Sequence, residues 1–172
     1  MLYPGGAREA LTGDRSYPLF WPQDKTDFVR TAARFNATIV PVSAVGMADS
    51  FNTIAKYEDI QRLPFLGGRL RNMTSQTVGA RFDSRNESDI LADLVVPGIP
   101  ARNYILFGKA IDTTNVDHKD LDNCGKIYRS LNKDVREGID DLMEAREKDP
   151  FKDTPRRIIY EQVFGKQAPT FP

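Results

Sequence analysis

Apolar residues recur at helical spacing towards the C-terminal end of the chain. Between Leu121 and Lys148 they step by three and four residues, at Cys124, Ile127, Leu131, Val135, Ile139 and Leu142. This period predicts one long amphipathic helix whose apolar stripe packs on a core. Gly138 lies inside the helix and costs about 1 kcal/mol relative to alanine.

Two prolines punctuate the sequence after this helix. Pro150 stops it, because proline cannot continue the hydrogen-bond ladder. Thr154 and Pro155 then predict the start of a short helix that runs to about Phe164, with threonine as the cap and proline in the first position.

Residues 25–36 predict an earlier helix, for which Asp24 and Thr26 are candidate caps. The next run, Ala37–Val45, is rich in β-branched residues and predicts a buried strand, as does Asn103–Phe107. A helix tightly connected to a strand is typical of an α/β fold, here a mixed sheet covered by helices.

The middle of the chain has a weaker pattern. Residues 51–61 predict one or two short helices, and 112–123 a polar loop. Between Arg62 and Phe82 the chain carries arginines and no acidic residue. The apolar residues Leu63, Phe65 and Leu66 with the cations Arg69 and Arg71 are therefore candidates for contact with a lipid interface. The alternative is an irregular excursion that folds back over the core.

Composition narrows the function classes. The chain has 172 residues, enough for one domain, and balances 24 basic against 24 acidic residues, so no global field selects nucleic acid or an anionic membrane. Cys124 is the single cysteine and suits a reducing compartment. No apolar run approaches the roughly 20 residues that span a bilayer, and no targeting peptide precedes the first motif.

The most specific local signal is a run of nine residues near the start, Tyr3-Pro4-Gly5-Gly6-Ala7-Arg8-Glu9-Ala10-Leu11. Adjacent glycines leave the backbone bare, and residues 7–11 predict the first turn of a helix, whose N-terminus attracts anions. Arg8 is a candidate partner for phosphate or carboxylate. The alternative is an ordinary glycine turn before a helix.

Candidate catalytic groups are scarce. His118 is the single histidine and lies in a charged run, residues 115–120, that predicts a solvated loop, so it is a poor candidate for a general base. One cysteine and one histidine cannot make a tetrahedral zinc site. The chain also has no G-x-S-x-G elbow and no phosphate-binding glycine loop of the G-x-G-x-x-G or G-x-x-x-x-G-K-[ST] type. Cys124 lies on the apolar stripe and predicts a buried structural thiol.

Several blocks, in order and spacing, resemble one family. They are residues 3–11, 19–22, 27–35, 37–42, 104–111 and 146–151. They resemble the plant plastid acyltransferase-like proteins of the phytyl ester synthase family, in the diacylglycerol acyltransferase branch of the lysophospholipid acyltransferase-like superfamily. The likeness covers almost the whole chain, which resembles the C-terminal portion of an acyltransferase-like domain.

The resemblance implies transfer of a fatty acyl group from acyl-CoA or acyl-carrier protein to phytol or diacylglycerol, in plastids, with no further cofactor and no metal. It implies that Gly5, Gly6, Arg8 and Glu9 contact the acyl acceptor or donor, with Glu9 also fixing the motif internally. Arg30 is a further candidate for contact with the same substrate. The alternative is that Arg30 forms a surface salt bridge. The resemblance implies that the protein binds peripherally to a membrane or to a lipid-droplet surface. It does not imply nucleic acid as a partner.

The family's His-x-x-x-x-Asp pair is expected ahead of the glycine motif, in sequence that this chain does not contain. We therefore expect residues 1–172 to form a single truncated domain that is incomplete for catalysis. Two alternatives stay open at this point. One is an inactive lipid- or membrane-binding remnant, and the other is a phosphate- or nucleotide-binding module.

Overall fold

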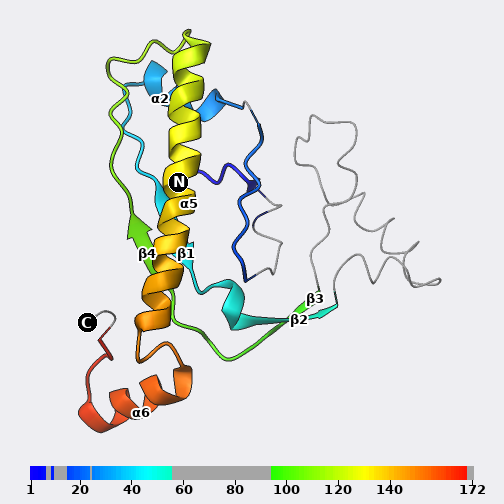
Figure 1. Ribbon diagram of the computed structural model, residues 1–172, viewed down its shortest axis with the longest axis vertical. Helices are drawn as coiled ribbons and strands as arrows, with labels where there is room; N and C mark the ends of the chain where they lie inside the picture. The colour runs from blue at the N-terminus through cyan, green and yellow to red at the C-terminus, as the bar shows by residue number, and fades with distance from the viewer. Residues whose placement is uncertain (7–8, 10–14, 24, 56–93, 170–172) are drawn as a thin grey trace, which may run out of the picture. The chain divides into compact units, whose positions relative to one another are not determined.

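The structure is a computed structural model and describes residues 1–6, 9, 15–23, 25–55 and 94–169. The chain divides into two compact units. The first combines residues 1–20 with 48–99, and the second combines 21–47 with 100–172. Figure 1 labels the elements of both units.

A single long helix, α5 (Leu121–Lys148), runs the length of the second unit (Figure 1). Asp120 caps it, since its side chain accepts a hydrogen bond from Asn123 N at 3.0 Å. Arg146 and Lys148 in the last turn complement the helix dipole. Both ends agree with the bounds predicted from the apolar stripe.

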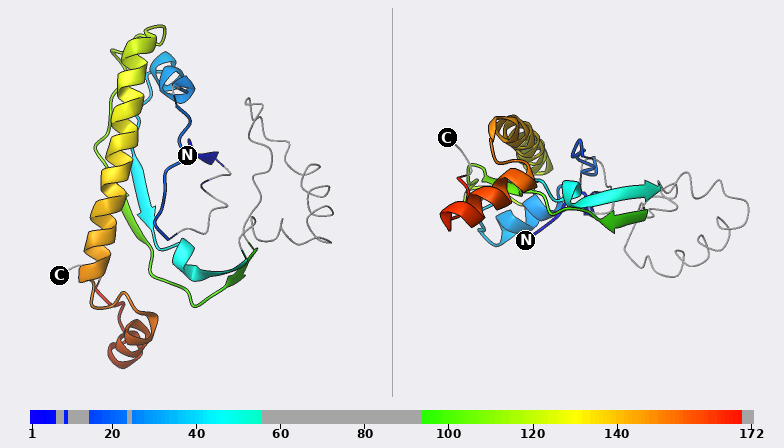
Figure 2. Two further views of the ribbon diagram at one scale, coloured as in Figure 1. Left: turned by 45° about the vertical axis from the view of Figure 1, so that its right-hand side comes forward. Right: turned by 90° about the horizontal axis from the view of Figure 1, so that it is seen from below.

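Two antiparallel strands, β1 (Val42–Val45) and β4 (Tyr104–Phe107), pack against α5. They run beside the helix in the left-hand view of Figure 2. Ser43, Val45 and Tyr104 are buried, whereas Ile105 and Phe107 are 59% and 69% exposed. The prediction of buried strands is therefore correct for one face and wrong for the other, because α5 covers one side of this two-stranded sheet.

A shorter helix, α2 (Asp27–Arg34), packs on α5 near its start. Val29 of α2 forms a buried cluster with Cys124, Tyr128 and Leu131. Around this cluster, the Trp21 ring meets the rings of Phe28 and Tyr128 with centroids 6.0 and 5.5 Å apart. Cys124 is a free, fully buried thiol whose pKa is raised by burial, which confirms its structural role.

The first unit has a 3-10 turn, η1 (Ala48–Ser50), and the antiparallel strands β2 (Phe51–Ala55) and β3 (Leu94–Pro97). Helix was predicted from residue 51, and this is wrong for residues 51–55, which gain backbone partners on β3 that no local pattern reveals. Residues 56–61 and the candidate lipid-contact residues Leu63, Phe65, Leu66, Arg69 and Arg71 lie outside the described residues.

The last helix, α6 (Thr154–Phe164), has its predicted bounds. The expected threonine cap is wrong, because Asp153 occupies the cap position and the Thr154 hydroxyl donates to Pro100 O at 2.9 Å. The described part of the chain combines helices with small antiparallel sheets, which confirms the α/β class. The described strands form two separate antiparallel pairs.

Residue 138 lies where α5 comes closest to β1. A Cβ atom on Gly138 would lie 2.5 Å from Ser43 Oγ and 3.4 Å from Leu106 Cδ2. The Ser43 hydroxyl donates to Val135 O at 2.9 Å, so strand and helix are also joined by a buried hydrogen bond. Glycine is therefore required here by packing, although it is unfavourable for the helix itself.

We predict that Gly138→Ala destabilises the protein by about 1 to 3 kcal/mol, because the added methyl group forces Ser43 and β1 away from the helix. Chemical denaturation measures the free energy of unfolding. Gly125→Ala is the matched control, since a Cβ on Gly125 meets only the flexible Arg129 side chain at 3.4 Å or more. This control is expected to gain up to about 1 kcal/mol. Equal gains for both variants would contradict the close approach.

Candidate functional site

The candidate site is the glycine motif at the start of the first unit. Gly6 N donates to Tyr3 O at 3.0 Å and closes a turn. Gly6 has φ of 58°, a left-handed conformation that favours glycine. No atom of a described residue lies within 4 Å of where its Cβ would be, so the described part of the motif leaves this backbone bare. Residues 7, 8, 10 and 11 lie outside the described residues.

The Glu9 side chain is directed into its own unit. Its Oε1 accepts a hydrogen bond from Phe20 N at 2.7 Å. A Cβ on Gly5 would clash with Cδ of Glu9. Only glycine at position 5 therefore leaves room for the carboxylate to reach Phe20.

Partial burial raises the pKa of the Glu9 carboxyl, and the hydrogen bond from Phe20 partly opposes this shift. A carboxyl whose pKa is raised on folding favours the folded state more below that pKa than above it. The ionised group thus costs stability as the pH rises through its pKa, and the Phe20 hydrogen bond offsets part of this cost.

The segment that carries Phe20 is itself anchored. The Tyr17 hydroxyl donates to Asp49 Oδ2 at 2.8 Å, and Arg15 Nε lies 3.6 Å from Asp49 Oδ1. Arg15 also donates to Phe51 O at 3.2 Å. Contacts with η1 and β2 thus fix residues 15–20, and Glu9 fixes the glycine motif to them.

This geometry changes the interpretation of the motif as an anion cradle. The Gly6 N–H group is engaged within the turn, and the Glu9 carboxylate is engaged by Phe20. Neither group is free to hold a ligand without a rearrangement. The open backbone beside Gly6 is the part of the described motif that a substrate can approach closely.

The histidine belongs to the second unit and lies in an exposed loop. His118 has 41% of its side chain exposed, and its Nδ1 lies 3.9 Å from Asp117 Oδ1. Arg30 Nε donates to His118 O at 3.2 Å, and Arg30 Nη1 lies 3.8 Å from Asp27 Oδ1. Arg30 thus makes the surface salt bridge that the sequence offered as its alternative role.

Two searches of the described residues were negative. They contain no group of three or more His, Cys, Asp or Glu side chains placed to hold a metal ion. None of the helices among them is both long enough and apolar enough to cross a membrane.

A buried polar cluster in the second unit was missed by sequence reasoning. Asp149 Oδ2 accepts from the Tyr104 hydroxyl at 2.6 Å and from Arg102 Nη1 at 3.2 Å. The Asp149 side chain is fully buried and that of Arg102 is 9% exposed. Arg102 also donates to Ala168 O at 2.5 Å and to Pro169 O at 2.9 Å, which fastens the C-terminal segment.

The signal for this cluster was present in the resemblance. Tyr104 and Asp149 each belong to one of the matching blocks, residues 104–111 and 146–151. Burial and the hydrogen bond to Asp149 raise the pKa of Tyr104 above its ordinary range, so the phenol stays a donor. Two blocks far apart in the sequence thus meet in one hydrogen-bonded cluster.

The chain is similar to two plant proteins named phytyl ester synthases. This similarity confirms the resemblance that the sequence blocks indicated. It is 35% identical over 168 residues to Phytyl ester synthase 1, chloroplastic, and 34% identical over 179 aligned positions to Phytyl ester synthase 2, chloroplastic, both of Arabidopsis thaliana. No family model and no solved structure matches the chain.

The alignments differ in how much of each protein they cover. They include 93% and 99% of this chain but 24% and 25% of the two relatives. The chain thus spans about a quarter of the length of the curated relatives it matches. Both relatives are named chloroplastic, which supports the plastid localisation expected from the sequence.

We predict that Glu9→Ala speeds hydrogen exchange at the Phe20 amide by about fivefold, the equivalent of one hydrogen bond of about 1 kcal/mol. Gly5→Ala is expected to do the same, because its methyl group displaces the Glu9 side chain. Nuclear magnetic resonance measures this exchange rate. Glu9→Gln is the control, since its carbonyl oxygen still accepts the bond. Unchanged exchange in Gly5→Ala would contradict the steric link.

We predict that Asp149→Ala destabilises the protein by about 3 to 5 kcal/mol, because it leaves Arg102 buried without its counter-ion. Tyr104→Phe removes one hydrogen bond and is expected to cost about 1 kcal/mol. Chemical denaturation measures both values. The double variant Arg102→Met/Asp149→Ala is expected to lose less than the sum of the single variants. Strict additivity would argue against a coupled cluster.

Proposed function

We propose that this chain is a portion of an acyltransferase-like protein that transfers a fatty acyl group to phytol in plastids. The observation that supports this most directly is the match to two phytyl ester synthases over almost the whole chain. The acyl donor we propose is acyl-CoA or acyl-carrier protein, with diacylglycerol as a second acceptor. In this proposal the protein meets these substrates while it is bound peripherally to a membrane or to a lipid-droplet surface.

Within that activity, we assign substrate binding to the glycine motif. The bare backbone beside Gly6 lets an acyl donor or an alcohol approach closely. Arg8 supplies a cation for a phosphate or pantetheine-linked group. Gly5 and Glu9 act by holding the turn in place through Phe20. These assignments need no metal ion and no cofactor beyond the acyl donor.

Ester formation also requires a base that takes the proton of the attacking hydroxyl group. The single histidine of this chain, His118, lies in an exposed loop beside Asp117. It lacks the His-x-x-x-x-Asp context expected of this superfamily. We therefore propose that the 172 residues contribute binding and need a base from elsewhere for catalysis. The same observation favours the second candidate function, that of a lipid-binding protein without turnover.

We predict that the purified chain binds acyl-CoA or acyl-carrier protein in calorimetry but shows no transfer of labelled acyl groups to phytol, because a missing base costs about 10² to 10⁴ in rate. Arg8→Ala is expected to weaken donor binding by about tenfold, the loss of one charge-assisted hydrogen bond. Arg136→Ala, an exposed arginine on α5, is the control.

Two results would revise this proposal. Transfer of label to phytol by the purified chain would place a base within these residues and end the claim of incompleteness. A donor affinity that is unchanged in Arg8→Ala, or binding of a nucleotide in place of the acyl donor, would remove the glycine motif from acyl transfer and favour a phosphate-binding module.

A further inference from the structure

The last helix, α6, has its apolar residues on the outside. Ile158, Ile159 and Val163 are 44%, 62% and 70% exposed, and no residue of α6 is buried. At about 100° per residue these three side chains fall within an arc of about 140° of the helix. A surface helix ordinarily directs such a stripe towards its own core.

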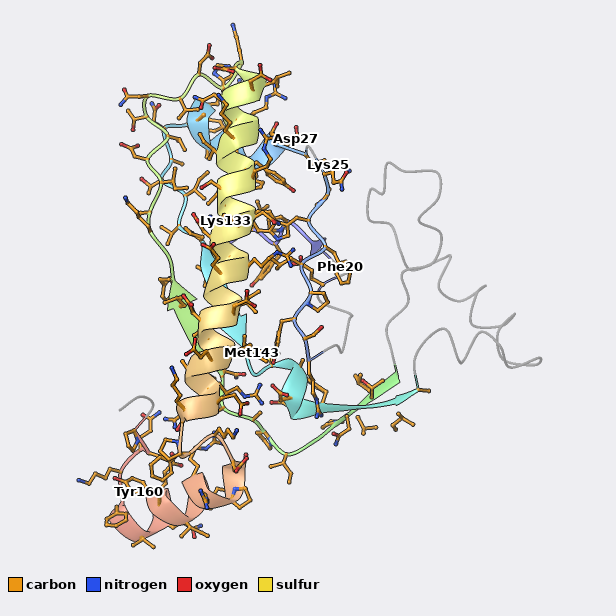
Figure 3. The ribbon with its side chains drawn as sticks, viewed as in Figure 1. Phe20, Lys25, Asp27, Lys133, Met143 and Tyr160 are labelled. Carbon is orange, nitrogen blue, oxygen red and sulfur yellow. The ribbon has the colours of Figure 1, made fainter. Side chains whose placement is uncertain are left out.

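The side of α6 that contacts the protein is polar and aromatic instead. Thr154 Oγ1 and Arg157 Nη2 donate to Pro100 O at 2.9 and 3.3 Å. Glu161 Oε1 accepts from Ala168 N at 3.3 Å. The ring of Tyr160, which is labelled in Figure 3, contacts the rings of Phe151 and Phe164 in tilted arrangements, with centroids 4.7 Å from each.

These contacts fix which face of α6 points outward. Arg102 holds the chain just after α6 through Ala168 O and Pro169 O. The helix is thus tied to the buried Asp149 cluster along one side and at its end. Its aliphatic face is held outward by hydrogen bonds that a simple roll of the helix would break.

Charge around this face indicates what it meets. Arg156 is exposed and, at about 100° per residue, falls next to Val163 around the helix. Lys166 is exposed just after the helix end, and the acidic Asp153 is exposed at its start. Glu161, the one acidic residue within α6, bonds to Ala168 N on the inner side. Aliphatic side chains flanked by cations fit an anionic lipid surface, where the cations meet head groups and the aliphatic residues enter the acyl boundary.

We propose that α6 is a membrane-docking helix, which lies in the interface of an anionic lipid surface through Ile158, Ile159 and Val163. The occupant is an anionic lipid bilayer, and Arg156 and Lys166 contact its head groups. This surface is separate from residues 63–71, which the sequence offered for the same purpose. It does not depend on acyl transfer, because docking is measured without turnover.

The test is flotation of the 172-residue chain with phosphatidylcholine vesicles that contain phosphatidylglycerol, and with phosphatidylcholine vesicles alone. The wild-type chain is expected to float with the anionic vesicles. Ile159→Ser/Val163→Ser is expected to reduce the bound fraction by about tenfold, since two aliphatic side chains no longer leave water. Arg156→Glu is expected to reduce binding to the vesicles that contain phosphatidylglycerol and to leave binding to phosphatidylcholine vesicles unchanged.

The matched control is Ile105→Ser, which changes an aliphatic residue of similar exposure on β4 and is expected to float like the wild type. Circular dichroism checks that each variant is folded. Flotation that survives Ile159→Ser/Val163→Ser, or that is lost only with Arg69→Glu/Arg71→Glu, overturns the proposal. So does a wild-type chain that stays with the solvent, or one that self-associates through α6 in sedimentation and leaves the vesicles unbound.

Discussion

The second unit depends on the close approach of α5 to β1 at Gly138. The absence of a side chain there lets the Ser43 hydroxyl reach Val135 O, and it sets the depth at which the strand lies on the helix. Val45, Leu131 and Leu142 are buried in this unit. Because interiors are closely packed, an added methyl group at this point shifts a whole strand rather than one side chain.

The blocks that carry the family resemblance are also the segments that hold one another in place. Glu9 of the first block bonds to Phe20 of the second. Tyr128 on α5 donates to Pro22 O at 2.5 Å. Tyr104 and Asp149 join the last two blocks within the protein. The resemblance therefore reports on architecture, because residues of different blocks hold one another in place.

Two features of the described residues bear on the proposed function, the glycine motif and helix α6. The glycine motif is a braced turn suited to a substrate, and α6 is a helix fastened by its polar side with its aliphatic side outward. His118 lies in an exposed loop, so the proposed function takes the described residues to contribute binding and takes the base to come from elsewhere.

Local sequence patterns were sufficient to predict the bounds of a helix where those bounds depend on the residues of that helix alone. The stripe of α5, the Pro150 stop and the start of α6 follow from residue spacing alone, and the structure agrees with each. Residues 51–55 were wrongly predicted as helix because their partner, β3, lies about 40 residues away in the sequence. The exposed face of Ile105 and Phe107 could not be foreseen either, since a short apolar run does not say how many of its faces are covered.

The sequence by itself determined the α/β class, the long helix and the likeness to phytyl ester synthases, because periodicity and motif order are local properties. The tertiary structure decided what particular residues do. Gly138 is required by a strand, Glu9 is bonded to Phe20, and Asp149 is buried against Arg102 and Tyr104. Each of these roles depends on a contact between segments distant in the chain, and such contacts exist only once the chain has folded.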